Sequence, residues 1–167
     1  YVTRYDILGD AKDGGTFLLN CSWTDAELEN ELPAFMKRQI ANKHLKFYTI
    51  DGLHIALAAG SAKSTNMVMQ AAFFKLANII PYEQAEEYMK QAVIKSYGKK
   101  GQKVIDANFA AIDGAIAGLH EVTVPAEWAN ATTGAALPEA TDSEYFESFV
   151  RPIVEQKGNS LPVSVFN

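Results

Sequence analysis

The stretch from residue 60 to residue 66, Gly-Ser-Ala-Lys-Ser-Thr-Asn, is the part of the sequence whose residue types best suit the binding of an anion. Gly60 and its small neighbours allow a ligand to approach the backbone closely, and Lys63 adds a positive charge. The helix expected from Asn66 onward presents free N–H groups at its start. The stretch is not a Walker A loop, because no Gly-Lys-Ser/Thr follows in the required spacing. Two interpretations stay open, an anion-binding loop and an ordinary connection between two helices.

A second set of polar residues follows the two expected strands. Asn20 and Ser22 come directly after the apolar run 16–19, and Asp51 follows the run 46–50. In open α/β sheets ligands bind beyond the carboxyl ends of the strands, so these side chains share one rim if the strands are parallel neighbours. We expect either a polar rim that meets a ligand or a partner domain, or a set of helix caps, since Asn, Ser and Asp commonly cap helices.

The cysteine and histidine residues predict neither a catalytic nor a metal site. Cys21 is the single cysteine, which excludes an internal disulfide and an iron–sulfur or structural zinc site built on cysteines of this chain alone. No histidine partner is predictable for it, so we expect a buried structural thiol. The three histidines lack a metal-binding spacing such as His-x-x-x-His. We therefore predict no catalytic residue and no metal ligand.

The composition is that of an ordinary globular domain. The 167 residues suffice for a domain with a core, and 48% of them are hydrophobic. A net charge of −5 implies no broad basic surface for nucleic acid, and the cluster of Lys99, Lys100 and Lys103 is typical of a solvated helix end. No segment approaches the roughly 18 apolar residues of a membrane span, and one cysteine fits a reducing compartment. We predict a cytoplasmic protein with neither a nucleic-acid nor a membrane partner.

Strands and helices that alternate along the chain must position these residues. The run 16–19 is short and apolar, as expected for a strand buried on both faces, and residues 46–50 predict a second strand. Thr24 with Glu27 three residues later is a capping-box pattern that starts a helix. The other expected elements are a short helix over 4–11, helices over 33–43, 51–60, from 66, 81–95 and 101–118, and a closing strand over 121–124.

This order of elements predicts an α/β fold, layered, with a mainly parallel sheet flanked by helices. Two strands are well marked, so we expect the sheet to be incomplete in this chain. The composition changes after Trp128: residues 129–144 are typical of a linker, and 145–156 predict a short helix. Because the sequence opens on Tyr1 like the inside of a domain, we expect a fragment, with one domain over 1–128 and a linker with the start of a connecting segment over 129–167.

Six stretches of the chain occur in an order that is typical of one family. They are residues 14–20 (GGTFLLN), 46–51 (KFYTID), 66–74 (NMVMQAAFF), 97–101 (YGKKG), 108–113 (NFAAID) and 161–164 (LPVS). Together they resemble the gamma domain of single-chain pyruvate:ferredoxin/flavodoxin oxidoreductases, members of the 2-oxoacid:acceptor oxidoreductases, followed by the connector to the next domain. The match covers nearly the whole chain.

The resemblance implies a parent enzyme that oxidatively decarboxylates pyruvate to acetyl-CoA and passes electrons to ferredoxin or flavodoxin. Such an enzyme uses thiamine diphosphate with magnesium and [4Fe–4S] clusters. Neither the diphosphate-site motif nor a cluster-binding cysteine series is present in this sequence, so we expect those sites elsewhere in the parent. The implied partners are the parent's other domains and, through them, ferredoxin or flavodoxin; the parent is expected to be a homodimer.

The resemblance also implies a role for this piece. In the family the gamma domain packs over the active site and helps hold coenzyme A (CoA), and the loop before the Asn-x-x-x-Gln helix carries an arginine suited to a CoA phosphate. That position is Ser64 here, beside Lys63, which could substitute as a point charge but not as a bidentate fork. The expected CoA contacts are Gly60, Lys63, Ser64 and Asn66. The isolated chain is expected to be inactive. The alternatives are a non-catalytic assembly domain and an independent small-molecule-binding α/β domain.

Overall fold

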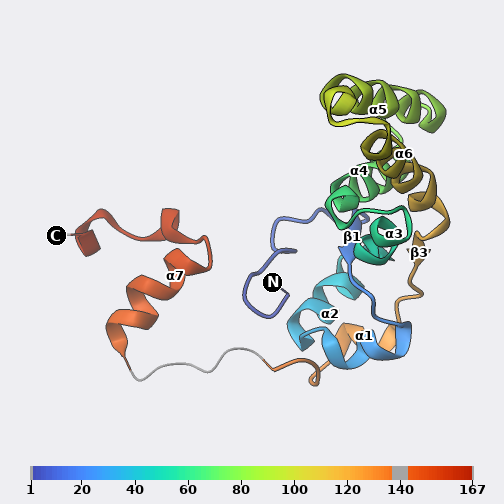
Figure 1. Ribbon diagram of the computed structural model, residues 1–167. Coiled ribbons are helices and arrows are strands. Elements are labelled where there is room, and N and C mark those ends of the chain that lie inside the picture. The colour runs from blue at the N-terminus through green and yellow to red at the C-terminus, as the bar shows by residue number, and fades with distance from the viewer. Residues whose placement is uncertain (1, 137–142, 167) are drawn as a thin grey trace. The chain divides into compact units, whose positions relative to one another are not determined.

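The computed structural model describes residues 2–136 and 143–166 of the chain, as helices and short strands (Figure 1). The elements are β1 (Thr16–Asn20), α1 (Asp25–Glu31), α2 (Ala34–Asn42), β2 (Lys46–Ile50), α3 (Gly52–Ala58), the 3₁₀ turn η1 (Ala62–Ser64), α4 (Thr65–Ala77), α5 (Tyr82–Tyr97), η2 (Gly98–Lys100), α6 (Gln102–Ala117), β3 (His120–Glu121), η3 (Ala126–Asn130), η4 (Phe146–Val150), α7 (Arg151–Val154), η5 (Gly158–Ser160) and η6 (Val163–Phe166).

The chain divides into two compact units, and each draws on separate stretches of the sequence. The first unit comprises Tyr1–Asp13, Thr24–His44 and Val124–Asn167, and the second comprises Gly14–Trp23 and Leu45–Thr123. This packing does not test the expected boundary at residue 128, which stays a prediction. Residues 137–142 of the expected linker lie outside the described residues.

The second unit contains a small sheet in the order β1-β2-β3. β1 pairs parallel to β2 from Thr16↔Lys46 to Asn20↔Ile50, and β3 pairs antiparallel to β2. The predicted α/β class, with a mainly parallel sheet flanked by helices, is confirmed, and the sheet is a small one. Two details were wrong. The closing strand covers His120–Glu121 and not 121–124. β1 is half-buried and not buried on both faces, because it lies at an edge of the sheet that the described residues form.

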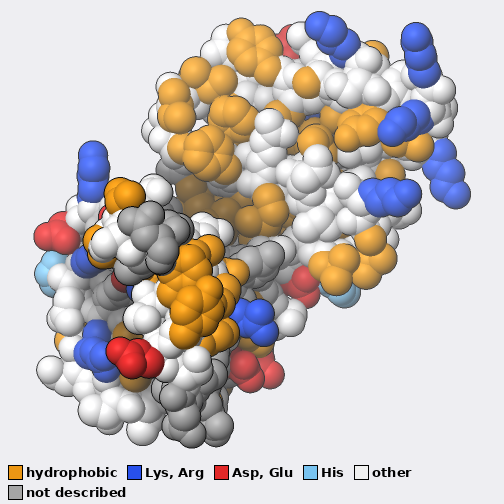
Figure 2. All heavy atoms as spheres, turned by 90° about the vertical axis from the view of Figure 1, so that its left-hand side faces the viewer, with side chains coloured by type: hydrophobic (Ala, Val, Ile, Leu, Met, Phe, Trp, Pro, Cys, Tyr) orange, Lys and Arg blue, Asp and Glu red, His pale blue; other side chains and the backbone are white. Residues whose placement is uncertain are grey.

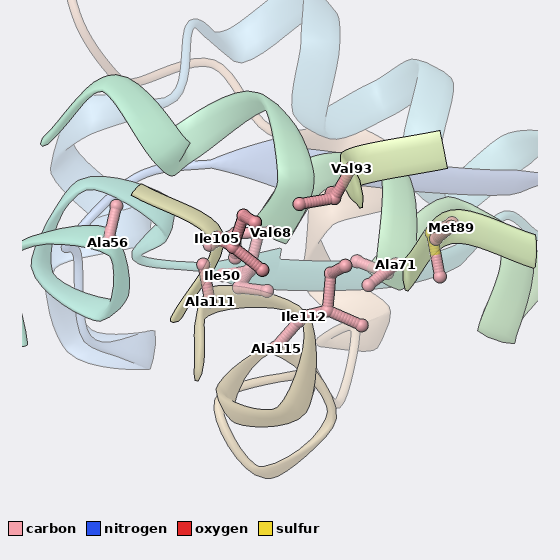
Figure 3. Packing of buried hydrophobic residues seen from close by; sticks show 11 residues of the cluster. Ile50, Ala56, Val68, Ala71, Met89, Val93, Ile105, Ala111, Ile112 and Ala115 are labelled. Atoms are coloured by element: carbon pink, nitrogen blue, oxygen red, sulfur yellow. The ribbon is translucent and has the colours of Figure 1, made fainter. Parts of the chain in front are cut away.

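Helices α3 to α6 pack around an apolar core in the second unit (Figure 3). Alanines occupy many of the buried positions on α4 and α6, so these two helices approach each other closely. Gly118, just after α6, lies so near the Ile55 side chain that an added Cβ would stand 2.4 Å from Ile55 Cδ1. The core residues are Ile50, Ala56, Val68, Ala71, Ala72, Met89, Val93, Ile105, Ala111, Ile112 and Ala115.

The first unit begins its helices where the sequence predicts. Thr24 Oγ1 accepts a hydrogen bond from the Glu27 N–H (3.3 Å), and the Glu27 carboxylate accepts one from the Thr24 N–H (2.8 Å), which completes the capping box of α1. The expected helix over 4–11 was wrong: residues 2–4 and 7–10 form turns, and residues 5 and 6 have no regular structure. The Lys43 ammonium donates to the carbonyls of Leu8, Gly9 and Ala11, so these carbonyls are satisfied without helical N–H donors.

The predicted helix over 145–156 is confirmed by η4 and α7, which run together from Phe146 to Val154. Its first turn is a π-turn, and the Arg151 guanidinium donates to the Glu147 carboxylate one turn back, at 2.7 Å for Nη2 to Oε1.

Candidate functional site

A cavity of about 450 Å³ lies in the second unit, between the connection from α3 to α4 and the junction of α5 with α6. Three lysines line it, and among the described lining residues none is acidic. The lining residues are Gly60, Ser61, Lys63, Ser64, Tyr97, Lys100, Lys103, Val104, Ala107 and Asn108.

One wall is the loop that the sequence singled out. Gly60 has φ of +102°, a left-handed conformation that glycine adopts without strain, and a Cβ built on it would lie 3.9 Å from the Ala107 Cβ of α6. Ser61 Oγ accepts a hydrogen bond from the Lys63 N–H at 3.3 Å, and its carbonyl accepts from the Ser64 N–H at 2.9 Å. These bonds fold the loop into a tight turn with Ser64 buried and Lys63 exposed.

A second part of the lining comes from the junction between α5 and α6. Gly101 turns the chain there with φ of +94° and ψ of 161°, a backbone region open essentially to glycine alone. This turn brings Lys100 and Lys103 to the same cavity. The Lys100 ammonium lies over the ring of Tyr97, 5.1 Å from the ring centroid, and both lysines are exposed.

The floor on the α6 side combines one amide with two apolar side chains. Asn108 is buried, and its Nδ2 donates to the Val104 carbonyl at 2.7 Å. This bond uses one of the two amide donors and none of the acceptor capacity of the side chain. Val104 and Ala107 supply apolar lining beside it.

The lining residues suit the binding of a polyanion. Three ammonium groups from two separate stretches of chain surround the cavity, and no carboxylate among the described lining residues opposes them. Lysines act as point charges for phosphate groups, and their attraction is strongest at low ionic strength. A buried amide and serine at the same cavity add neutral hydrogen-bonding groups. The arrangement can hold a multiply charged ligand, and it presents no nucleophile–base pair for catalysis.

Of the four predicted loop residues, the structure brings three to the cavity. Gly60, Lys63 and Ser64 line it, whereas Asn66 lies in the first turn of α4 outside the lining set. Sequence reasoning missed Lys100 and Lys103 as site residues, because a basic cluster at a helix end is usually solvated. The one signal in the sequence that could have identified them was their position at the start of the expected helix over 101–118.

Two of the three predicted rim residues, Asn20 and Asp51, lie at the start of α3. Asn20 Oδ1 accepts a hydrogen bond from the Gly52 N–H at 2.9 Å, and Asp51 Oδ1 accepts from the His54 N–H at 2.9 Å. Both side chains therefore act as helix caps, one of the two interpretations that the sequence left open. Ser22 is exposed beyond the end of β1. A role of these residues at an interface stays a prediction.

Cys21 lies beside this rim, and its backbone N–H donates to the Ile50 carbonyl at 3.0 Å, which extends the parallel pairing. Burial raises the pKa of the Cys21 thiol, and the nearby Asp51 carboxylate raises it further, against a lowering by a backbone hydrogen bond from Trp23. A raised pKa favours the protonated thiol, which is the less reactive form.

Neither a metal site nor a membrane span is found in the described part of the chain. Within residues 2–136 and 143–166, no three His, Cys, Asp or Glu side chains come together as metal ligands would. Across the same ranges, no helix combines the length and apolar character needed to cross a membrane.

Comparison with known proteins gives one consistent family. The family model for pyruvate ferredoxin/flavodoxin oxidoreductase matches residues 1–118. A pyruvate-flavodoxin oxidoreductase of Klebsiella pneumoniae is 50% identical over 166 residues, and a pyruvate:ferredoxin oxidoreductase of Moorella thermoacetica is 48% identical over 166 residues; each match covers 99% of this chain. A mitochondrial pyruvate dehydrogenase (NADP+) of Euglena gracilis is 42% identical over 168 residues, again with 99% of this chain covered.

The chain spans a small part of these relatives. It corresponds to 14% of the length of the Klebsiella and Moorella proteins and to 9% of the Euglena protein. The names of the relatives share pyruvate and differ in the electron acceptor, which is ferredoxin, flavodoxin or NADP+.

Proposed function

The chain belongs to the pyruvate ferredoxin/flavodoxin oxidoreductase family, and we propose that within such an enzyme it covers the active site and helps hold CoA. The whole enzyme would oxidatively decarboxylate pyruvate, form acetyl-CoA and pass electrons to ferredoxin or flavodoxin. The names of the relatives support pyruvate as the substrate and leave the acceptor open.

The observation that carries the CoA role is the shared cavity of Lys63, Lys100 and Lys103. CoA carries a diphosphate and a 3′-phosphate, so it presents several negative charges close together. Lys63 alone would be one point charge where an arginine fork is expected in the family. Two further lysines from the α5–α6 junction compensate for that difference, because each adds an ammonium group that can contact a phosphate oxygen.

The metal cofactors of the proposed reaction do not fit the donor groups of this chain. A [4Fe–4S] cluster is usually held by four cysteine thiolates, and the sequence contains one cysteine. Among the described residues no group of acidic or imidazole side chains offers a magnesium site. We therefore place magnesium and the clusters on other parts of the longer enzyme, and thiamine diphosphate with the magnesium that it requires, and we assign no step of their chemistry to these residues.

A role in assembly is the second candidate, and the surface of α3 favours it. Leu53 and Leu57 lie one turn apart on this helix and are 52% and 57% exposed. Figure 2 also shows apolar side chains spread over the face of the part of the chain that holds α4 to α6. Such residues suit contact with neighbouring domains of the longer enzyme. An assembly domain without a ligand role would show no CoA binding.

Calorimetric titration of the chain with CoA at low salt separates the two functions. We expect saturable binding that weakens about fivefold in Lys63→Ala and in Lys100→Ala, since each substitution removes one phosphate contact. Lys99→Ala is the matched control, because Lys99 is an exposed neighbour that does not line the cavity. Absence of binding, or an equal loss in Lys99→Ala, would favour assembly.

A further inference from the structure

Tyr97 is the one aromatic side chain among the described residues that line the basic cavity. It ends α5, is half-buried, and packs against the apolar core of the second unit. The core contact fixes the ring, and the cavity places it beside Lys100 and Lys103. A fixed aromatic ring next to a cluster of ammonium groups is a combination that recurs where proteins hold nucleotides, with a base on the ring and phosphates on the cations.

The position of Lys100 shows which part of the ring is open. Its ammonium group lies over the ring, 5.1 Å from the centroid, and the lysine itself is exposed. The core therefore does not cover that face of the ring, and water reaches the ammonium that lies on it. A cation–π contact at an exposed site is weak, so a ligand can displace it at little cost.

We propose that Tyr97 is a stacking platform for the purine base of the ligand, and that Lys100 moves from the ring to a phosphate when the base arrives. The same lysine would then cover the aromatic face in the free protein and neutralise ligand charge in the complex. The neighbouring Val104 and Ala107 supply apolar surface, and no acidic lining residue among those described opposes the phosphates. The proposal rests on the proposed CoA role and assigns the selectivity for the adenosine part to Tyr97.

The test compares a ligand that has a base with one that does not. Adenosine 3′,5′-bisphosphate and inorganic pyrophosphate are titrated into the chain and into Tyr97→Leu. We expect Tyr97→Leu to weaken the binding of the bisphosphate about tenfold, in line with the loss of one base–aromatic stack, and to leave the affinity for pyrophosphate unchanged. Tyr97→Phe keeps the ring and is expected to bind both ligands as the wild type does.

Tyr88→Leu is the matched control, because Tyr88 is an exposed tyrosine of the same helix outside the lining set. Retained pyrophosphate binding shows that the cavity of Tyr97→Leu is intact. An equal loss of both ligands in Tyr97→Leu, or an unchanged affinity for the bisphosphate, overturns the stacking proposal while lysine-dependent CoA binding still stands. Failure of CoA and of both probes to bind the wild type overturns the CoA role and the stacking proposal with it.

Discussion

Replacement of Glu29 by glutamine is expected to destabilise the first unit, because the Glu29 carboxylate holds a buried ammonium group. The Lys37 side chain is fully buried, with Nζ 2.6 Å from Glu29 Oε1 and 2.8 Å from the Glu29 carbonyl. The second carboxylate oxygen accepts a hydrogen bond from the indole of Trp128. Glutamine keeps one acceptor oxygen, so Glu29→Gln loses the negative charge and one of the two acceptors.

The size of the effect follows from how deeply each partner is buried. Removal of one partner from a fully buried pair costs about 3–5 kcal/mol. The Glu29 side chain is 48% exposed, so water screens the pair, and the carbonyl of Glu29 still accepts from Lys37. We expect a loss of about 2 kcal/mol in the free energy of unfolding, between the values for exposed and buried pairs. For a chain of this size the midpoint of thermal unfolding falls by about 4–8 °C.

Tryptophan fluorescence measures this loss in the unit concerned. The sequence has two tryptophans, so in a Trp23→Phe background the signal of Trp128 alone follows urea unfolding. Glu31→Gln makes the same chemical change at an exposed position of the same helix and is expected to be neutral. The double variant Glu29→Gln/Lys37→Met removes both charges and is expected to recover at least half of the loss.

Two results would refute this reasoning. One is a Glu29→Gln variant within about 0.5 kcal/mol of Glu31→Gln, which is the range of ordinary surface substitutions. The other is a double variant less stable than the sum of its single substitutions, because removal of an unpaired buried charge must restore stability.

Three further predictions concern stability and the cavity. The hydrogen bonds to Glu29, first that from Lys37, lower the pKa of the Glu29 carboxyl below 4.5. The ionised carboxylate therefore contributes fully to the stability of the fold above about pH 4.5, and this contribution is lost as the pH falls through the lowered pKa. The urea midpoint should therefore fall more in the wild type than in Glu29→Gln between neutral pH and about pH 3. Gly118→Ala places a Cβ 2.4 Å from Ile55 Cδ1 and should cost about 1 kcal/mol in urea unfolding, which Ile55→Val removes. Gly101→Ala should cost about 1–3 kcal/mol and weaken pyrophosphate binding, because alanine does not tolerate φ of +94° at this ψ.

Matched variants decide these predictions. If the urea midpoint falls equally in the wild type and in Glu29→Gln when the pH is lowered, the loss of stability in acid belongs to other carboxyl groups. Gly118→Ala with the same cost in the Ile55→Val background would contradict the proposed clash. Gly98→Ala controls for Gly101→Ala, since Gly98 has φ of −53° and open space around its Cβ position, and it should be neutral.

Local signals in the sequence predicted most of the secondary structure. Thr24 with Glu27 started α1, and the run 46–50 became β2, because caps and short apolar runs act over a few residues. The prediction of a helix over 4–11 was wrong because Lys43 binds carbonyls of that stretch. Lys43 follows the end of α2 and lies more than 30 residues away in the sequence. No local pattern contains that contact.

The candidate site shows the same limit. Gly60 and Lys63 were predicted because small residues and a charge occur together in one loop. Lys100 and Lys103 were not, because they meet Lys63 only through the packing of α6 against α4 and the glycine turn at residue 101. The role of Trp128 as a partner of Glu29 was equally unpredictable, since 99 residues separate them in the sequence.

The most direct test of the CoA role is to locate the ligand by NMR. In a titration of the ¹⁵N-labelled chain with CoA, the largest amide shifts should occur in residues 60–65 and 97–108, which surround the cavity. The shifts should saturate and should shrink in Lys63→Ala but not in Lys99→Ala. Saturable shifts confined to other parts of the chain, or none at a large excess of CoA, would contradict the account.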